Sequence, residues 1–555
     1  MFSLDPTHSR LTGATTVLSV PWEPLRPGPA GSRIRVMDDR PDGTNAGLLD
    51  LDDPDLLAQD GLAPDESDPL FRQQMVYAVI ASLLETLDQA RGRHLVWRNI
   101  WRDSPDGPRV RPLAVFPHRI RGANAFYAPG EGLSFGSFEA RADPEAPLFP
   151  GQWVHGCLSH DIVNHEAGHA FLHELRPMSL QPTGLDALAF HEGFADILAI
   201  LQHFRLPGLL ESQVAQSGTA IWQPGPFVQL AAEFGQGSGK KEAVRVALDD
   251  AQAPAPYTRF TEPHDRGAVL VAALFEAFFA TYVLRITPIL RVAGYSSATT
   301  ATTLPGEMIA LVCDQARAAA TTVLNMTVRA LDYLPPVDIQ FGDFLEAVVL
   351  ADTDLHPDDR FGFRRSFVEA CRRRAIYATS RQEAELDRRE SIVAKLEPLP
   401  TQQALVLATH DLGDEHVTDP SRARAGGQLN RWWRAELLEW GQRNAEHLGL
   451  DKELLRVDGG NASFRWNQDG FPTGVVTVRF TQRNEQVEAR MPDRLRGVPL
   501  VGGVTLISHA DGIVHHAVCK PVPGVGLAGF DALERITSEA DPAAQAAFGC
   551  LSGAQ

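Results

Sequence analysis

The stretch "NHEAGHAFLHE" at residues 164–174 constrains this chain more than any other. It places His165 and His169 four residues apart, with Glu166 directly after the first histidine. Apolar residues at helical spacing just before them predict a helix with one buried face. On such a helix the two imidazoles share a face and can bind one metal ion, and Glu166 lies beside them. A catalytic zinc site needs a third protein ligand, so the stretch predicts a second element that supplies one.

His173, the third histidine of the stretch, is too far along the helix to complete the site. It follows His165 by eight residues, which is about 12 Å along a helix axis. Zinc–nitrogen bonds of about 2.1 Å cannot span that distance. The longer motif with a third histidine six residues after the second also fails, because that position is Leu175. We therefore expect His173 on the helix surface or behind the ligands.

A glutamate and an aspartate one helical turn apart offer the missing ligand. In "LAFHEGFADILAILQHF", residues 188–204, apolar residues form one helix face, and Glu192 and Asp196 lie over one another on another face. If this helix packs against the first, Glu192 can bind the metal and Asp196 can accept the free ring N–H of a ligand histidine. The alternative is a solvated pair of carboxylates. The combination with the HExxH motif favours the ligand interpretation.

HExxH followed by "EGFAD" resembles the thermolysin-like zinc peptidases, whose third ligand is a glutamate on a following helix. The stretch "ANAFYAPGEGLSFG", residues 123–136, is similar to the edge strand that binds substrate in that family. The resemblance implies that Asn124 and Ala125 bind the substrate backbone. A further stretch, "EPHDRGAVLVAALFEAF", is similar to the segment that carries the transition-state histidine, here His264.

The resemblance implies an α+β fold with two lobes and a zinc helix between them. We expect a β-rich N-terminal lobe at 1–155 and a helical zinc-peptidase lobe at 156–395. Residues 401–555, outside the resemblance, are predicted to form a smaller α+β accessory module of unknown role.

The function implied is that of a zinc-dependent peptidase, an endopeptidase in preference to an exopeptidase. One Zn²⁺ held by two histidines and Glu192 would activate a water, with Glu166 as general base and His264 stabilising the oxyanion. Two alternatives stay open. One is a non-proteolytic zinc-binding scaffold. The other is a target-specific protease effector directed by the C-terminal module.

Two positions of the family pattern are not matched. The accessory tyrosine is replaced by Leu180, and Tyr257 is the candidate to replace it. The arginine that binds the substrate carbonyl has no clear counterpart. Arg259 and Arg266 are candidates, and each also fits a structural or surface charge.

Bulk composition narrows the class of protein. A chain of 555 residues is too long for one ordinary core, so two or three domains are expected. The formal net charge of −19 argues against nucleic acid, whose phosphates bind clustered Lys and Arg. We expect a peptide or protein substrate as partner. The oligomeric state stays open.

We expect a cytoplasmic location and no membrane span. The first residues lack the basic and apolar regions of a secretory signal, although export by a non-classical route stays open. The apolar segment 267–284 has marginal length and carries Glu276 in its middle, which favours a buried core helix. Five scattered cysteines form no disulfide framework, so reduced thiols are expected.

Aspartate clusters at 50–55 and 352–359 could bind calcium, but neither has the ligand spacing of a calcium loop. The sequence therefore does not support a calcium site.

Overall fold

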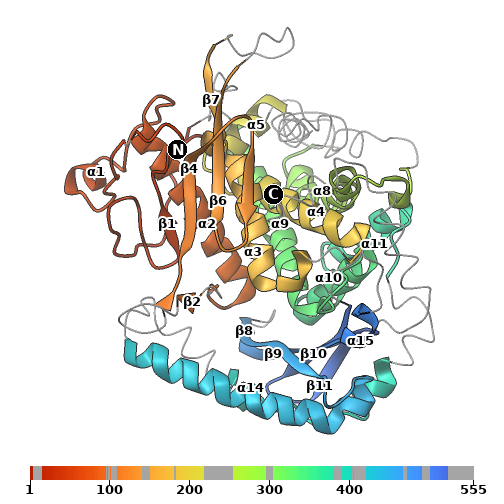
Figure 1. The fold of residues 1–555 in the computed structure, drawn as a ribbon. Helices are drawn as coiled ribbons and strands as arrows, with labels where there is room; N and C mark the ends of the chain where they lie inside the picture. Colours follow the sequence, from red (N-terminus) through yellow and green to blue (C-terminus); the bar gives the residue numbers. More distant parts are fainter. Residues whose placement is uncertain are drawn as a thin grey trace.

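The structure is a computed structural model, and the described part of the chain combines two larger β-sheets and a short two-stranded one with a central body of helices (Figure 1). The expected α+β class is confirmed. The described residues are 1–3, 15–44, 46–95, 97, 100–101, 109–140, 151–180, 183–217, 254–295, 304–378, 389–402, 404–405, 420–466, 472–489 and 500–522.

The first sheet has the strand order β1-β4-β6-β5, and β7 also pairs with β6. The β1–β4 and β4–β6 pairs are parallel, whereas β5 and β7 run antiparallel to β6. The strands of this sheet and of the separate β2–β3 pair are β1 (Ile34–Val36), β2 (Ile100–Trp101), β3 (Arg109–Val110), β4 (Leu113–Arg121), β5 (Ala125–Ala128), β6 (Gly132–Glu139) and β7 (Trp153–His155).

Helix α2 (Pro69–Arg91) packs against this sheet, after the short helix α1 (Pro54–Ala58). The Asp68 side chain caps α2 by accepting a hydrogen bond from the Leu70 amide. Apolar side chains at helical spacing, Phe71 and Met75 among them, are fully buried, as the sequence pattern predicted.

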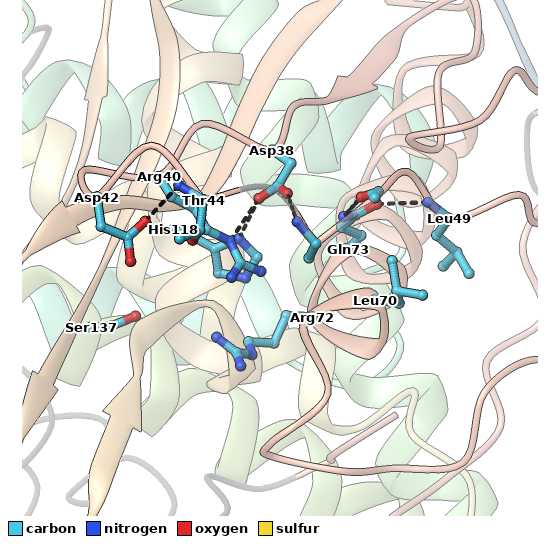
Figure 2. A network of polar contacts seen from close by, with 12 residues as sticks. Asp38, Arg40, Asp42, Thr44, Leu49, Leu70, Arg72, Gln73, His118 and Ser137 are labelled. Atoms are coloured by element: carbon cyan, nitrogen blue, oxygen red, sulfur yellow. Dashed lines mark hydrogen bonds and ion pairs between the residues drawn. The ribbon is translucent and has the colours of Figure 1, made fainter.

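A polar network fixes the segment between β1 and α1 to the sheet and to α2 (Figure 2). The Asp38 carboxylate lies 3.1 Å from Nε of Arg40 and 3.2 Å from Nδ1 of His118 on β4. The side-chain oxygen of Gln73 accepts a hydrogen bond from the Leu49 amide at 3.0 Å. These bonds hold in place a segment with little regular secondary structure.

The helical body is built around α4, which packs between α3 and α8. A Cβ atom at Gly168 of α3 would lie 3.0 Å from the Ala195 Cα, and one at Gly193 would lie 3.0 Å from the Gly267 carbonyl oxygen. Residues without side chains therefore let these backbones approach closely. The elements are η2 (Gly156–Leu158), α3 (His160–Leu175), η3 (Pro177–Leu180), α4 (Leu185–His203), α5 (Leu209–Ser217), η4 (Tyr257–Arg259), α8 (Pro263–Val292), α9 (Gly306–Tyr333), α10 (Phe341–Leu355) and α11 (Phe363–Arg373).

Among the described helices, α8 is long and apolar enough to cross a membrane by length and composition, and 72% of its most apolar window is buried inside the protein. It packs against α4, α9 and α11, which is the environment predicted for a core helix. Its one central acid, Glu276, pairs with Arg374 at 2.7 Å.

The C-terminal part is an antiparallel meander of four strands with α14 lying across it (Figure 1). Trp433, Leu437 and Trp440 of α14 are buried in a hydrophobic cluster that is separate from the main core. A turn at Asp511–Gly512 joins the last two strands, with Gly512 at φ 81°. The elements are α14 (Pro420–Leu448), β8 (Arg456–Trp466), β9 (Pro472–Arg483), α15 (Glu485–Glu488), β10 (Val501–His509) and β11 (Val514–Lys520).

This C-terminal unit docks on the helical body through apolar and polar contacts, since Val475, Ile507 and Val518 of its sheet belong to the main core. The Thr505 hydroxyl donates to the Leu334 carbonyl at 2.7 Å, and Arg176 at the end of α3 donates to the same oxygen at 2.5 Å. Lys520 pairs with Asp343 at 2.8 Å. The main core itself is continuous from the first sheet through α11, so the segments 1–155 and 156–395 share one core.

The four described cysteines, Cys157, Cys313, Cys371 and Cys519, are buried and have free thiols. The fifth, Cys550, lies outside the described residues.

Candidate metal centre

Helices α3 and α4 run antiparallel and bring the predicted ligands together. His165 faces Asp196, and His169 faces His191, which precedes Asp196 on α4. One ligand atom from each of His165, His169 and Glu192 lies within 4.8 Å of the other two. Glu192 is at least 23 positions from either histidine in the sequence, yet it lies in one cluster with them, as the motif spacing predicted. Their role as metal ligands stays a prediction.

One oxygen of Glu192 lies at the centre of this cluster. Its Oε2 atom is 3.4 Å from Nε2 of His165, 3.7 Å from Nε2 of His169 and 3.1 Å from Nε2 of His264. The side chains of His165, His169 and Glu192 are between 7% and 12% exposed. Three imidazole nitrogens therefore surround one carboxylate oxygen in a nearly dry site.

The outward nitrogen of each candidate ligand histidine has a partner on α4. Nδ1 of His165 lies 2.8 Å from Oδ1 of Asp196, which is the pairing predicted from the sequence. Nδ1 of His169 lies 2.6 Å from Nδ1 of the buried His191, so one ring donates and the other accepts. Both candidate ligands consequently turn Nε2 inward, towards Glu192. His191 was not predicted, and its only sequence signal is its place directly before Glu192.

Burial and neighbouring groups set the charges of the site. Burial alone would lower the pKa of His165, but the carboxylates of Asp196 and Glu192 raise it to about 10. Burial lowers the pKa of His169 well below its usual value, so this imidazole is neutral and has a lone pair to share. Burial would raise the pKa of Glu192, yet His264 and His169 hold it well below its usual range. Glu192 is therefore an anion.

Glu166 lies beside the candidate ligands on α3 and is 8% exposed. Its carboxylate is close enough to help raise the pKa of His165. A buried acid at this place can exchange protons with a group bound in the cluster.

His264 reaches the cluster from the first turn of α8. Its Nδ1 lies 2.6 Å from Oε1 of Glu262, and Glu262 also caps the helix by accepting from the Asp265 amide at 2.8 Å. This arrangement turns Nε2 of His264 towards Glu192. His264, which the sequence predicted, thus adds a third helix, α8, to the site formed by α3 and α4.

The arginine and tyrosine candidates that the sequence left undecided are not part of this cluster. Arg266 donates from Nε to Asp186 at 2.7 Å and stacks on the Tyr257 ring at 4.4 Å. The Tyr257 hydroxyl lies 3.4 Å from the same carboxylate, so both residues belong to a structural group around Asp186. Arg259 is exposed.

Strand β5 follows Asn124 and is the end strand of the sheet beside α3. Ala125 pairs with Phe135 of β6, and among the described residues β5 pairs on that side only. The Tyr127 hydroxyl lies 2.8 Å from Nδ1 of His173, which joins the edge strand to the helix of the candidate ligands. His173 is half-buried and is not among the grouped candidate ligands.

Two imidazoles and one carboxylate are ligands typical of Zn²⁺, whereas Ca²⁺ takes six to eight oxygen ligands. The aspartate clusters considered for calcium are engaged in capping. Asp53 accepts from the Asp55 amide at 2.8 Å, and Asp359 accepts from the amides of Arg364 and Arg365 at 3.1 Å.

The sequence matches no model of a known protein family and no curated protein. A functional proposal therefore depends on the chemistry of the site.

Proposed function

We propose that this chain is a zinc-dependent peptidase that cleaves internal peptide bonds. The observation that carries the proposal is the convergence of three Nε2 atoms, from His165, His169 and His264, on one oxygen of Glu192. Glu166 lies beside them on α3. Catalytic zinc sites of peptidases use two imidazoles and a glutamate and keep a further position open.

The fit to zinc rests on the donor set and on its supports. Two nitrogens and one carboxylate oxygen lie within 4.8 Å of one another, so small side-chain rotations bring them to zinc-bonding distance. Asp196 and His191 hold the outward ring nitrogens and set which nitrogen faces the ion. A Zn²⁺ ion held there would polarise a substrate carbonyl and lower the pKa of a water towards neutrality.

The residues of the chain perform the proton transfers. Glu166 accepts a proton from the attacking water and passes it to the leaving nitrogen. His264 donates its Nε2–H to the carbonyl oxygen as negative charge builds there. Glu262 holds the opposite nitrogen of His264 at 2.6 Å and so keeps the donor aimed at the site.

The edge strand β5 supports the assignment of a peptide substrate. An extended peptide can add to the open side of β5 through main-chain hydrogen bonds, with Asn124 and Ala125 at the start of that edge. Binding along an edge strand grips a peptide over several residues. This favours cleavage within a chain over removal of a terminal residue.

The test is cleavage of an unbiased peptide mixture, read by mass spectrometry, for the wild type, Glu166→Gln and the exposed control Glu307→Gln. Metal content is measured for all three. We expect cuts by the wild type and the control that vanish in Glu166→Gln while zinc stays bound.

The alternatives predict other outcomes. A non-proteolytic scaffold binds zinc and cuts nothing. A dedicated effector cuts nothing in the mixture but cleaves one target in a lysate, and that activity disappears in Glu166→Gln. Cleavage that persists in Glu166→Gln overturns the proposed role of this residue.

A further inference from the structure

A second cluster of metal-ligating side chains lies at the other end of the α3–α4 pair. His160 and Asp161 open α3, and His203 ends α4. One ligand atom from each lies within 4.8 Å of the other two. Both histidines are 3% exposed, and the Asp161 side chain is 14% exposed. The cluster is thus nearly buried, with its carboxylate towards the solvent.

The ligand atoms converge on the Asp161 carboxylate. Nε2 of His203 contacts Oδ1 of Asp161, and Nδ1 of His160 lies 3.8 Å from the same oxygen. The ring centroids of the two histidines are 4.8 Å apart. Since one oxygen and two ring nitrogens lie within 4.8 Å of one another, a single ion can bind all three after small rotations.

Buried polar atoms beside the cluster have no partner among the described residues. Asn164 donates from Nδ2 to the His160 carbonyl at 2.8 Å, but its Oδ1 atom accepts nothing there. Nδ1 of His203 is also buried without a partner in that part of the chain. Buried polar groups are almost always satisfied, so these two atoms can accept or donate to a group that completes the site, such as a water on a metal ion.

We propose that His160, Asp161 and His203 bind a second transition-metal ion, of the Zn²⁺ class, which joins the start of α3 to the end of α4. Two imidazole nitrogens suit Zn²⁺, Co²⁺ or Ni²⁺, whereas Ca²⁺ and Mg²⁺ require oxygen ligands. This ion is separate from the proposed catalytic zinc. The two groups of candidate ligands share no residue.

The second ion therefore clamps the two helices that carry the candidate catalytic ligands. The inference does not rest on peptidase activity. A protein that cuts no peptide yet binds two ions leaves it intact and defeats only the proposed function.

The test uses the full chain, stripped of metal by a chelator and titrated with Co²⁺. Bound Co²⁺ is followed by its visible absorption, and bound Zn²⁺ is counted by elemental analysis after equilibrium dialysis. The variants are His203→Gln and Asp161→Asn for the second site and His169→Gln for the first. His447→Gln, exposed on α14, is the control.

We expect two equivalents for the wild type and the control and one for each site variant, with affinity at the altered site reduced at least 100-fold. A wild type that binds one equivalent, lost in His169→Gln, overturns the proposal and leaves the cluster as an ion pair. Two equivalents that survive in both His203→Gln and Asp161→Asn overturn it as well. The number of metal ions that the wild type binds is measured without any variant. A variant that fails to fold therefore leaves that result intact.

Discussion

Nδ1 of His165 on α3 lies 2.8 Å from Oδ1 of Asp196 on α4, and this contact determines which nitrogen of the histidine faces the candidate metal centre. With Nδ1 held by the carboxylate, Nε2 points to Glu192 at 3.4 Å. The same carboxylate makes the ring more basic, which strengthens a bond to a metal ion. Asp196 thus acts through His165.

Replacing Asp196 by Asn should weaken zinc binding about 10- to 100-fold, because an amide neither fixes nor polarises the ring as a carboxylate does. The measurement is competition for Zn²⁺ with a chromophoric chelator. Asp314→Asn on α9, where the side chain is 66% exposed, is the control and should bind zinc as the wild type does. Unchanged affinity in Asp196→Asn would show that the contact is only structural.

The parts of this site that local spacing sets could be predicted from the sequence. His165 and His169 share a helix face because they are one turn apart, and the same rule pairs Glu192 with Asp196. The strands before residue 140 and the core helix α8 also follow from local patterns of apolar residues.

Contacts that depend on how helices cross could not be predicted. His191 meets His169 only because α3 and α4 run antiparallel at close distance. His203 meets Asp161 for the same reason, 42 residues away in the sequence. The docking of Thr505 on the Leu334 carbonyl joins segments 171 residues apart, and no local pattern predicts it.

Replacing His264 by Gln should lower kcat about 10²- to 10³-fold with little change in KM, since its Nε2–H is proposed to act on charge that develops in the transition state. The measurement is steady-state cleavage of a peptide taken from the mixture experiment, with zinc content determined in parallel. His447→Gln serves as the control. Loss of zinc in the His264 variant would instead indicate a ligand or structural role.

Zinc binding to the metal-free protein should release a proton at neutral pH. His165 has a pKa of about 10, so it is protonated below that pH and must lose its proton to bind the ion. Affinity should therefore rise about tenfold per pH unit from pH 7 towards 10, and level off above. Calorimetry in two buffers of different ionisation enthalpy counts the protons. The Asp161→Asn background isolates the first site. Binding without proton release would contradict a raised pKa for His165.

Gly193→Ala should destabilise the fold by about 1–3 kcal/mol, because the added methyl group overpacks the crossing of α4 and α8. Its Cβ would lie 3.0 Å from the Gly267 carbonyl oxygen, which is main chain and cannot rotate away. The measurement is chemical denaturation. Gly306→Ala at the start of α9 is the matched control, since a Cβ there meets nothing within 4 Å. Equal stability of the two variants would show that the crossing has room to relax.

Tyr127→Phe should reduce kcat/KM for a peptide up to about tenfold while zinc content stays unchanged, since a hydrogen bond contributes about 0.5–1.5 kcal/mol. The Tyr127 hydroxyl, 2.8 Å from Nδ1 of His173, joins the edge strand to the helix of the candidate ligands. Without it, a bound peptide should be held less well against the proposed zinc site. Tyr77→Phe is the matched control, because its hydroxyl bonds Glu23 at 3.0 Å, away from the candidate metal centre. If both variants lose kcat/KM equally, the effect is one of general stability and the edge strand is not positioned by His173.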